Sequence, residues 1–282
     1  MLDVLSVGNA NVDLIVNSDK IISAEPLVMP GGSACNFAVG CARLGLKAGF
    51  LGYTGKDSFG ELIKASLKRE RVMPFIKVVD EHTGLVLVFT KKRFKKFIKY
   101  AGANKRLELL RISQSAKHLH LATPPLSLLK QARGSVSVDP GASLSKYSLA
   151  ELKPYLSKIN VFLPNEAEAK AITGHSYKKA ANDLLSAGIK IVIIKLGRGG
   201  CYLKTSDESI RLPSIDYPAV DTTGAGDAFD SAFISAWLKG KLLREACQWG
   251  IISSNVCVTR LGAQNSATMK ELNAIKALLK TY

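Results

Sequence analysis

Short apolar runs alternate with helix-type segments over most of this chain, and this alternation limits the folds it can adopt. Segments such as 33–44 and 58–69 have helical spacing of their apolar residues. Strands that alternate with helices favour a parallel sheet covered by helices on both faces. We therefore predict an α/β fold with a doubly wound, mostly parallel central sheet. Its strands are expected at 2–7, 48–53, 118–122, 136–139, 161–164 and 191–195.

One region departs from the alternation. Strand signals at 75–79, 85–89 and 97–100 follow one another with only turn residues between them. We predict a small antiparallel lid outside the main sheet, formed by residues 14–30 and 75–100. The α/β nucleotide-binding domain would then consist of residues 1–13, 31–74 and 101–282.

Composition excludes several classes of protein. The chain has 282 residues, of which 47% are hydrophobic, which is enough for a full core. No apolar stretch approaches the ~20 residues of a membrane span, and Met1 is followed at once by a strand-like run rather than a signal peptide. Five cysteines without a CxxC pair favour reduced thiols over zinc or disulfides, and a cytoplasmic protein.

The chain is basic, with a net charge of +16, and such a surplus favours anionic partners. The densest cluster of cations lies in residues 91–99, where Phe94 and Phe97 stand between the basic side chains. Such a segment can bind nucleic acid, but it also fits a hairpin whose aromatic side chains face inward while its lysines stay in water. We prefer the hairpin because the segment follows the strand-like run 85–89, and we rank a nucleic-acid-binding protein far lower.

Residues 221–229 form the motif that says most about function. Gly224, Ala225 and Gly226 lack bulky side chains, so their backbone N–H groups can approach an anion at the start of a helix. Asp227 lies in that first turn, where it would repel a phosphate. Its presence makes sense if the site takes a proton from a hydroxyl while it holds a phosphoryl group. An ordinary acidic residue in a first helical turn is the alternative.

Two motifs near the N-terminus could bind hydroxyl groups. Asn11 and Asp13 follow the first strand, where doubly wound sheets bind ligands. Gly31 and Gly32 let the backbone approach a ligand, and Asn36 projects from the helical turn that follows. A turn held by Asn and Asp side chains and a plain helix cap are the alternatives.

Three later motifs could serve a nucleotide and its cation. Asn165 and Glu168 are three residues apart after a strand, and oxygen ligands there suit Mg²⁺, although the pair also fits a capping box. The turn 195–201 could pass under a nucleotide or could be only a tight connection. Residues 255–266 could border a base pocket or a cation site, with Gly262 as a helix C-terminal glycine in the alternative reading.

Taken together and in this order, the motifs resemble the ribokinase or PfkB family of carbohydrate and nucleoside kinases. The segment 221–229 matches its C-terminal signature without a gap, and Asn165 and Glu168 match its magnesium motif. The resemblance covers essentially the whole chain. Its N-terminal signature is matched by Gly31, Gly32, Asn36, Ala38, Leu44, Gly45, Gly52, Gly55, Asp57, Phe59 and Gly60.

The resemblance implies an ATP- and Mg²⁺-dependent phosphotransferase that acts on the hydroxymethyl group of a sugar. Asp227 would be the general base, with Gly224, Ala225 and Gly226 as the anion hole. Asn165 and Glu168 would hold Mg²⁺ through water. The remaining roles would fall to Asp13, Asn11, Gly31, Gly32 and Asn36 for the acceptor, to Lys195, Gly197, Gly200, Thr222 and Asn255 for the nucleotide, and to Asp221, Gly262 and Ser266 for a monovalent cation such as K⁺.

Departures from ribokinase itself leave the acceptor open. Ser33 stands where ribokinase has a lysine, and Ala122 stands where it has a glutamate near ribose. These changes count against ribose. A nucleoside kinase for adenosine, inosine or cytidine and a 2-keto-3-deoxygluconate kinase remain alternatives, as does ADP in place of ATP as the donor. Many relatives form a homodimer through the lid, which we also expect here.

Overall fold

A nine-stranded sheet forms the centre of the molecule. The computed structural model describes residues 1–17, 26–91, 94–215 and 217–279, and at 17, 90, 91 and 94–96 it describes only the backbone. The strand order is β13-β12-β11-β10-β9-β8-β1-β4-β5. Neighbours from β5 to β11 are parallel, while β12 and β13 pair antiparallel at one edge. The strands are β1 Leu2–Gly8, β4 Ala48–Gly55, β5 Met73–Val79, β8 Ala116–Ala122, β9 Val136–Asp139, β10 Val161–Phe162, β11 Ile191–Lys195, β12 Cys201–Lys204 and β13 Ser209–Leu212.

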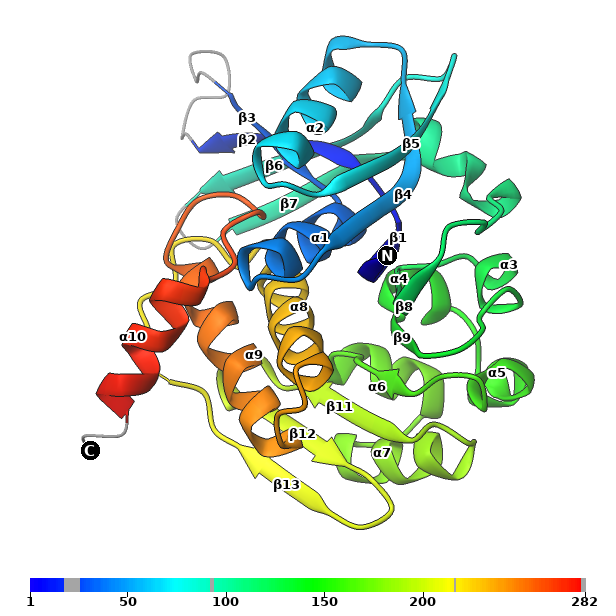
Figure 1. Cartoon of the computed structure of the whole chain (residues 1–282), viewed down its shortest axis with the longest axis vertical. Coiled ribbons are helices and arrows are strands. Elements are labelled where there is room, and N and C mark those ends of the chain that lie inside the picture. The colour runs from blue at the N-terminus through cyan, green and yellow to red at the C-terminus, as the bar shows by residue number, and fades with distance from the viewer. Residues whose placement is uncertain (18–25, 92–93, 216, 280–282) are drawn as a thin grey trace.

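Helices cover both faces of this sheet, as the alternation predicts (Figure 1). One layer is α1 Ser33–Arg43, α2 Ser58–Arg69, α8 Ala225–Leu238, α9 Leu243–Val258 and α10 Met269–Leu279. The other layer is the 3₁₀ helix η2 Gly102–Leu109 with α3 Leu126–Leu129, α4 Gly141–Leu144, α5 Leu149–Leu156, α6 Glu166–Thr173 and α7 Tyr177–Ser186. A short 3₁₀ turn, η3 Gly197–Gly199, joins β11 to β12.

Successive residues of the central strands belong to different cores. Val4 packs in the core with α1 and α8, whereas its neighbour Leu5 packs in the core on the other face. Phe50 and Leu51 are divided in the same way. Since side chains alternate across a strand, burial on both faces explains why these strands read as continuous apolar runs.

A second sheet of four strands lies at one end of the molecule, in the order β3-β2-β6-β7 (Figure 1). It consists of β2 Asn11–Asn17, β3 Leu27–Gly31, β6 Gly84–Lys91 and β7 Phe94–Tyr100. We call it the small sheet. β2 and β3 are antiparallel, as are β6 and β7, but β2 and β6 run parallel. The expectation of an antiparallel patch is therefore wrong for this pair.

The expected boundary of the lid also needs correction. Residues 75–79 were expected in the lid, but they belong to β5 at the edge of the main sheet. Asp13 was assigned to the main domain, but it lies on β2 in the small sheet. Apolar periodicity identifies a strand but not the sheet that it joins, because pairing depends on distant segments. The helix expected at 126–132 ends at Leu129.

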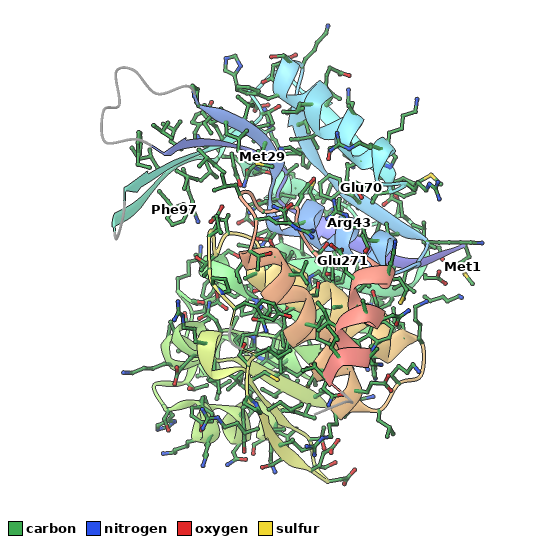
Figure 2. The ribbon with its side chains drawn as sticks, turned by 90° about the vertical axis from the view of Figure 1, so that its left-hand side faces the viewer. Met1, Met29, Arg43, Glu70, Phe97 and Glu271 are labelled. Carbon is green, nitrogen blue, oxygen red and sulfur yellow. The ribbon has the colours of Figure 1, made fainter. Side chains whose placement is uncertain are left out.

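β6 and β7, which contain the described part of the basic segment, pair antiparallel as the predicted hairpin requires. Residues 92 and 93 lie outside the described residues, as do the side chains of 90–96. Phe97 is 45% exposed and lies on the side of the small sheet toward the body of the molecule (Figure 2). Within the part of the chain that the structure describes, no helix is both long and apolar enough to cross a membrane.

Candidate active site

The start of α8, where we predict an anion site, lies beside a carboxylate. Gly224 precedes the helix with φ of 78°, a conformation that favours glycine, and a Cβ there would collide with the carbonyl oxygen of Ala263. The first N–H groups of a helix have no partners within it, and they lie at its positive end. Gly224, Gly226 and Asp227 line one cleft of about 560 Å³. The predicted base and anion hole therefore face the same space.

Asp227 has the electrostatic environment of a proton acceptor. Burial raises the pKa of its carboxyl group to about 7, and the nearby charge of Asp139 acts in the same direction. Asn36 donates from Nδ2 to Oδ2 of Asp227 at 2.7 Å, which lowers the pKa and fixes the carboxylate. A base with a pKa near neutral can take a proton and later release it at physiological pH.

A lysine held by two carboxylates lies next to the anion site. Nζ of Lys195 is 2.8 Å from Oδ2 of Asp230 and 3.2 Å from Oδ2 of Asp139. Burial alone would lower the pKa of Lys195, but the two carboxylates outweigh it and raise that pKa. Nζ also lies 3.5 Å from the point where a Cβ on Gly226 would be. A permanent cation is thus fixed where phosphate charge would collect.

A second cavity, of about 340 Å³, adjoins the anion site and contains all five predicted nucleotide residues: Lys195, Gly197, Gly200, Thr222 and Asn255. Its apolar lining includes Ile215, Ala219, Phe229 and Val258. Oδ1 of Asn255 accepts a hydrogen bond from Oγ of Ser214 at 3.2 Å, and its buried Nδ2 has no partner among the described residues. A cavity with an apolar lining and an amide donor that has no partner among the described residues suits a nucleobase.

The predicted acceptor residues meet at the other end of the cleft. Asn11, Asp13, Gly32 and Asn36 line it together with Asp227. Gly31 is not part of the lining, but a Cβ on it would lie 2.6 Å from Oδ2 of Asp13, so its backbone packs against that carboxylate. The structure thus brings β2 of the small sheet and α1 of the body to one site.

Asn165 and Glu168 form the capping box that was the alternative to a metal site. The Asn165 side chain accepts from the Glu168 N–H at 2.9 Å, and Oε2 of Glu168 accepts from the Asn165 N–H at 2.9 Å. Both residues also line the cleft, with Asp139 beside them. Burial and the charge of Asp139 raise the pKa of Glu168, as expected for two carboxylates close together. A capping box and a Mg²⁺ site at Asn165 and Glu168 are therefore compatible.

Known proteins resemble this chain in sequence and fold. The family model "pfkB family carbohydrate kinase" matches residues 1–270. The chain belongs to the pfkB family of carbohydrate kinases. This family consists of phosphotransferases that act on sugar hydroxyl groups, and ATP-dependent sugar phosphorylation is its shared activity.

Individual relatives of this pfkB protein span nearly its whole length. An uncharacterised sugar kinase of Archaeoglobus fulgidus is 30% identical over 242 residues, which is 80% of this chain and 97% of that protein. Ribokinase of Haemophilus influenzae is 29% identical and covers 91% of this chain and 94% of its own length. Among solved structures, Thermotoga maritima ribokinase has a TM-score of 0.87 at 29% identity over 98% of this chain and all of that one. A Methanocaldococcus jannaschii nucleoside kinase has a TM-score of 0.83 at 26% identity, covering 99% of both chains.

Of the cation residues expected from the pfkB resemblance, Asp221 and Gly262 are joined by a hydrogen bond. Asp221 accepts from the Gly262 N–H at 3.0 Å, and from the N–H and hydroxyl of Thr223 at 2.9 and 2.7 Å. The carbonyl oxygen of Ser266 accepts a hydrogen bond from Arg43. The Ser266 Oγ faces Gly40 of α1, and no described residue hydrogen-bonds to it.

The loop behind the anion hole is held from α1. Arg43 donates to the carbonyl oxygens of Gln264 and Ser266 at 2.8 and 3.1 Å, and it forms a 2.7 Å ion pair with Glu70 at the end of α2 (Figure 2). The same loop carries Ala263, which touches Gly224. Helix α1 therefore fixes the position of the turn that supports the anion site.

Sequence reasoning about this pfkB protein missed several residues of the site. Asp139 and Asp230 hold Lys195, and Phe97 and Lys99 line the cleft from β7. Asp230 could have been found, because it lies three residues after Asp227 on the same helix face. Lys99 looks like any other member of a basic segment, so only the strand pairing distinguishes it.

Proposed function

We propose that this chain transfers the γ-phosphoryl group of ATP to the hydroxymethyl group of a sugar, with Mg²⁺ as cofactor. The observation that carries the proposal is Asp227, whose carboxyl group has a pKa of about 7 and lies in the first turn of α8, beside the backbone N–H groups of that turn. A base and an anion hole in one cleft are the two groups that phosphoryl transfer to an alcohol requires.

In this mechanism Asp227 takes the proton of the acceptor hydroxyl, and the resulting oxygen attacks the γ-phosphorus in line with the leaving ADP oxygen. The bond from phosphorus to that ADP oxygen breaks, and Asp227 releases its proton to solvent. The N–H groups of the α8 first turn and Lys195 stabilise the charge on the migrating group. Asn36 keeps the carboxylate of Asp227 in position through its 2.7 Å hydrogen bond.

The residues at the cleft fit Mg²⁺. Glu168 and Asp139 present carboxylates of the hard oxygen type that this cation prefers, and Asn165 lies next to them. Within the described residues, no three His, Cys, Asp or Glu side chains converge as a metal cluster, so the ion would take most ligands from water and phosphate. When bound, Mg²⁺ neutralises phosphate charge. A solved relative at 23% identity, the putative ribokinase II of E. coli, was captured with ATP and Mg²⁺, and Arabidopsis ribokinase, at 26%, was captured with ribose and ATP.

A monovalent cation such as K⁺ near Asp221 and Gly262 is a further part of the proposal. Both oxygens of Asp221 already accept protein hydrogen bonds, so the ion would depend largely on backbone carbonyls. The test is the ADP release rate in potassium, sodium and tetramethylammonium buffers of equal ionic strength. Equal rates in all three would exclude the site.

The acceptor is tested by measuring ADP release with ribose, fructose, 2-keto-3-deoxygluconate, adenosine, inosine and cytidine. We expect a sugar to give the highest kcat/KM. A nucleoside is the second candidate because the exposed ring of Phe97 in the cleft could stack on a base. Parallel assays with ATP and ADP as donors identify the phosphoryl donor.

The base assignment is tested by Asp227→Asn. The amide cannot accept the proton, so we expect kcat to fall by about 10²- to 10⁴-fold while ATP binding stays. Asp207→Asn, at an exposed aspartate away from the cleft, is the matched control and should keep full activity. If Asp227→Asn keeps its activity, Asp227 is not the general base, and the proposal loses the residue on which it depends.

We also propose that the outer face of the small sheet forms a homodimer. Val28, Leu14, Leu87 and Ile98 are paired across the four strands, and Val28 and Ile98 are 43% and 48% exposed. A second copy would cover this apolar row. Ile98→Glu should convert a dimer into a monomer in light scattering, and a wild-type monomer would refute the proposal.

We further propose that the enzyme acts in the cytoplasm. The use of ATP and five cysteines outside disulfides both fit that compartment.

Nucleic-acid binding stays the distant alternative. It would depend on the basic segment 91–99, of which the structure describes only part. A gel shift with DNA or RNA that is lost in salt and lost on neutralising these lysines would support it. Nothing in that function requires Asp227 or Asn36.

A further inference from the structure

The inner face of the small sheet, which we define as the face toward the cleft, carries its side chains in rows across the strands. In one row Met29 is paired with Asp13, Asp13 with Val86, and Val86 with Lys99. Asp13, Val86 and Lys99 all line the cleft. Neighbouring strands lie about 4.8 Å apart, so the backbones at Asp13 and Lys99 are separated by about 10 Å.

The two ends of this row differ in charge. Asp13 on β2 is a carboxylate that is only 4% exposed, whereas Lys99 on β7 places a cation at the other end of the row. Lys195 and Lys99 are the cations among the described residues of the cleft. Lys195 is already paired with Asp139 and Asp230. No described carboxylate pairs with Lys99, so its charge is available to a ligand.

The row has the dimensions of a small sugar. A carboxylate such as Asp13 can accept two hydrogen bonds from adjacent hydroxyls, and the apolar side chain of Val86 can pack against ring carbons. A group on the far side of the sugar then meets Lys99. In the next row Phe97 pairs with Val88, and its ring lies on the same face as Lys99. Apolar surface beside a cation reduces its hydration and strengthens its attraction for an anion.

We propose that the acceptor is an anionic sugar and that Lys99 binds its carboxylate or phosphate group, away from the hydroxymethyl group that reacts. This inference rests on the proposed kinase function and narrows its substrate class. Lys99 acts as a specificity-determining residue and takes no part in proton transfer. The acidic groups Asp13, Asp139, Glu168 and Asp227 repel an anion at the other positions of the cleft, so Lys99 also fixes the direction in which the sugar binds.

The kinetic test compares acceptors that differ in charge. ADP release is measured with ribose, ribose 1-phosphate and 2-keto-3-deoxygluconate, so that a phosphate and a carboxylate are distinguished. We expect wild type to prefer one anionic acceptor over ribose in kcat/KM. Lys99→Ala should reduce kcat/KM for that acceptor roughly 10- to 100-fold, mainly through KM, as for a lost charged hydrogen bond. The KM for ATP and the rate with ribose should not change.

Two variants control for general damage. Lys99→Arg keeps the charge and should keep most of the preference. Lys77→Ala removes a lysine from β5, outside the cleft, and should behave as wild type. If Lys99→Ala slows ribose and the anionic acceptors equally, or if wild type prefers ribose to both anions, the inference is wrong.

A binding measurement separates this inference from the kinase function. Titration calorimetry of ribose, ribose 1-phosphate and 2-keto-3-deoxygluconate is carried out on wild type and on Lys99→Ala without nucleotide. Tighter anion binding that depends on Lys99, without ADP release for any acceptor, would uphold the inference and refute the kinase. ADP release with ribose, together with no preference for either anion in binding, would uphold the kinase and refute the inference.

Discussion

The two ends of the cleft are built from different kinds of groups. At the donor end, the ligand would meet backbone N–H groups at the start of α8, a glycine turn and Lys195, which is held by two carboxylates. At the acceptor end it would meet side chains in cross-strand rows of the small sheet. Backbone donors at a helix start cannot vary with side-chain identity, whereas rows of side chains can. The comparison suggests that the donor end carries the shared chemistry and the acceptor end carries the choice of sugar.

The largest effect is expected at the donor end, on the free energy of unfolding. Lys195→Met leaves Asp139 and Asp230 buried near each other without their cation, and removing one partner of a buried ion pair costs about 3–5 kcal/mol. Urea unfolding should show this loss. Lys204→Met on neighbouring β12, where the lysine is half-buried, is the control and should change little. An unchanged free energy of unfolding for Lys195→Met would mean that the two carboxylates share a proton instead.

Gly224→Ala is expected to damage the anion hole for every acceptor. Its φ of 78° is strained for alanine, and the new Cβ meets the Ala263 carbonyl, so the first turn of α8 must shift. Loss of an aligned oxyanion donor lowers kcat by about 10²- to 10³-fold. Gly240→Ala has nearly the same backbone strain, with φ of 74°, but open space around it, and should remain active. If kcat falls for one acceptor only, the start of α8 also affects the choice of sugar, and the proposed division between the donor end and the acceptor end is wrong.

The pKa of Asp227 predicts two pH effects. Activity should rise with pH and level off above about 7, as the base ionises. The pKa is raised above its ordinary value of 3.8 in the folded state, so ionisation of Asp227 destabilises the fold as pH rises from about 4 to 7. Asp227→Asn should therefore be more thermostable than wild type at pH 8, with a smaller difference at pH 5. A melting-temperature difference that is independent of pH would show that Asp227 titrates normally.

The smallest effect, on KM for the acceptor, is expected where the acceptor end of the cleft contacts the donor end. Met29 of the small sheet packs against Gly262, and the N–H of Gly262 donates to Asp221 behind the anion site. Met29→Ala should raise KM for the acceptor a few-fold and leave kcat nearly unchanged. Met73→Ala, at an exposed methionine of β5, is the control. A fall in kcat as large as that of Gly224→Ala would show that the two ends do not act separately.

The chemistry of the donor end could be predicted from the sequence because it depends on local geometry. Residues 224–227 need only one another and the start of a helix to form an anion site beside a carboxylate. The structure places Gly224, Gly226 and Asp227 on one cleft and Ala225 on the adjoining cavity. The segment 58–69 was likewise predicted with its observed ends, since a helix is fixed by contacts within four residues. By contrast, the capping box at Asn165 and Glu168 could not be separated from a metal site by spacing alone.

The sequence by itself determined the alternation of strands and helices, the glycine-rich start of α8 and the family to which the chain belongs. Only the tertiary structure decided that Asp13 lies in the small sheet, that residues 73–79 close the edge of the main sheet, and that Lys99 shares a row with Asp13. Helical and anion-binding geometry depends on residues a few positions apart. Strand pairing joins residues that can be far apart in the sequence, such as Asp13 and Val86, which are 73 positions apart. Side-chain periodicity does not record which strands will be neighbours.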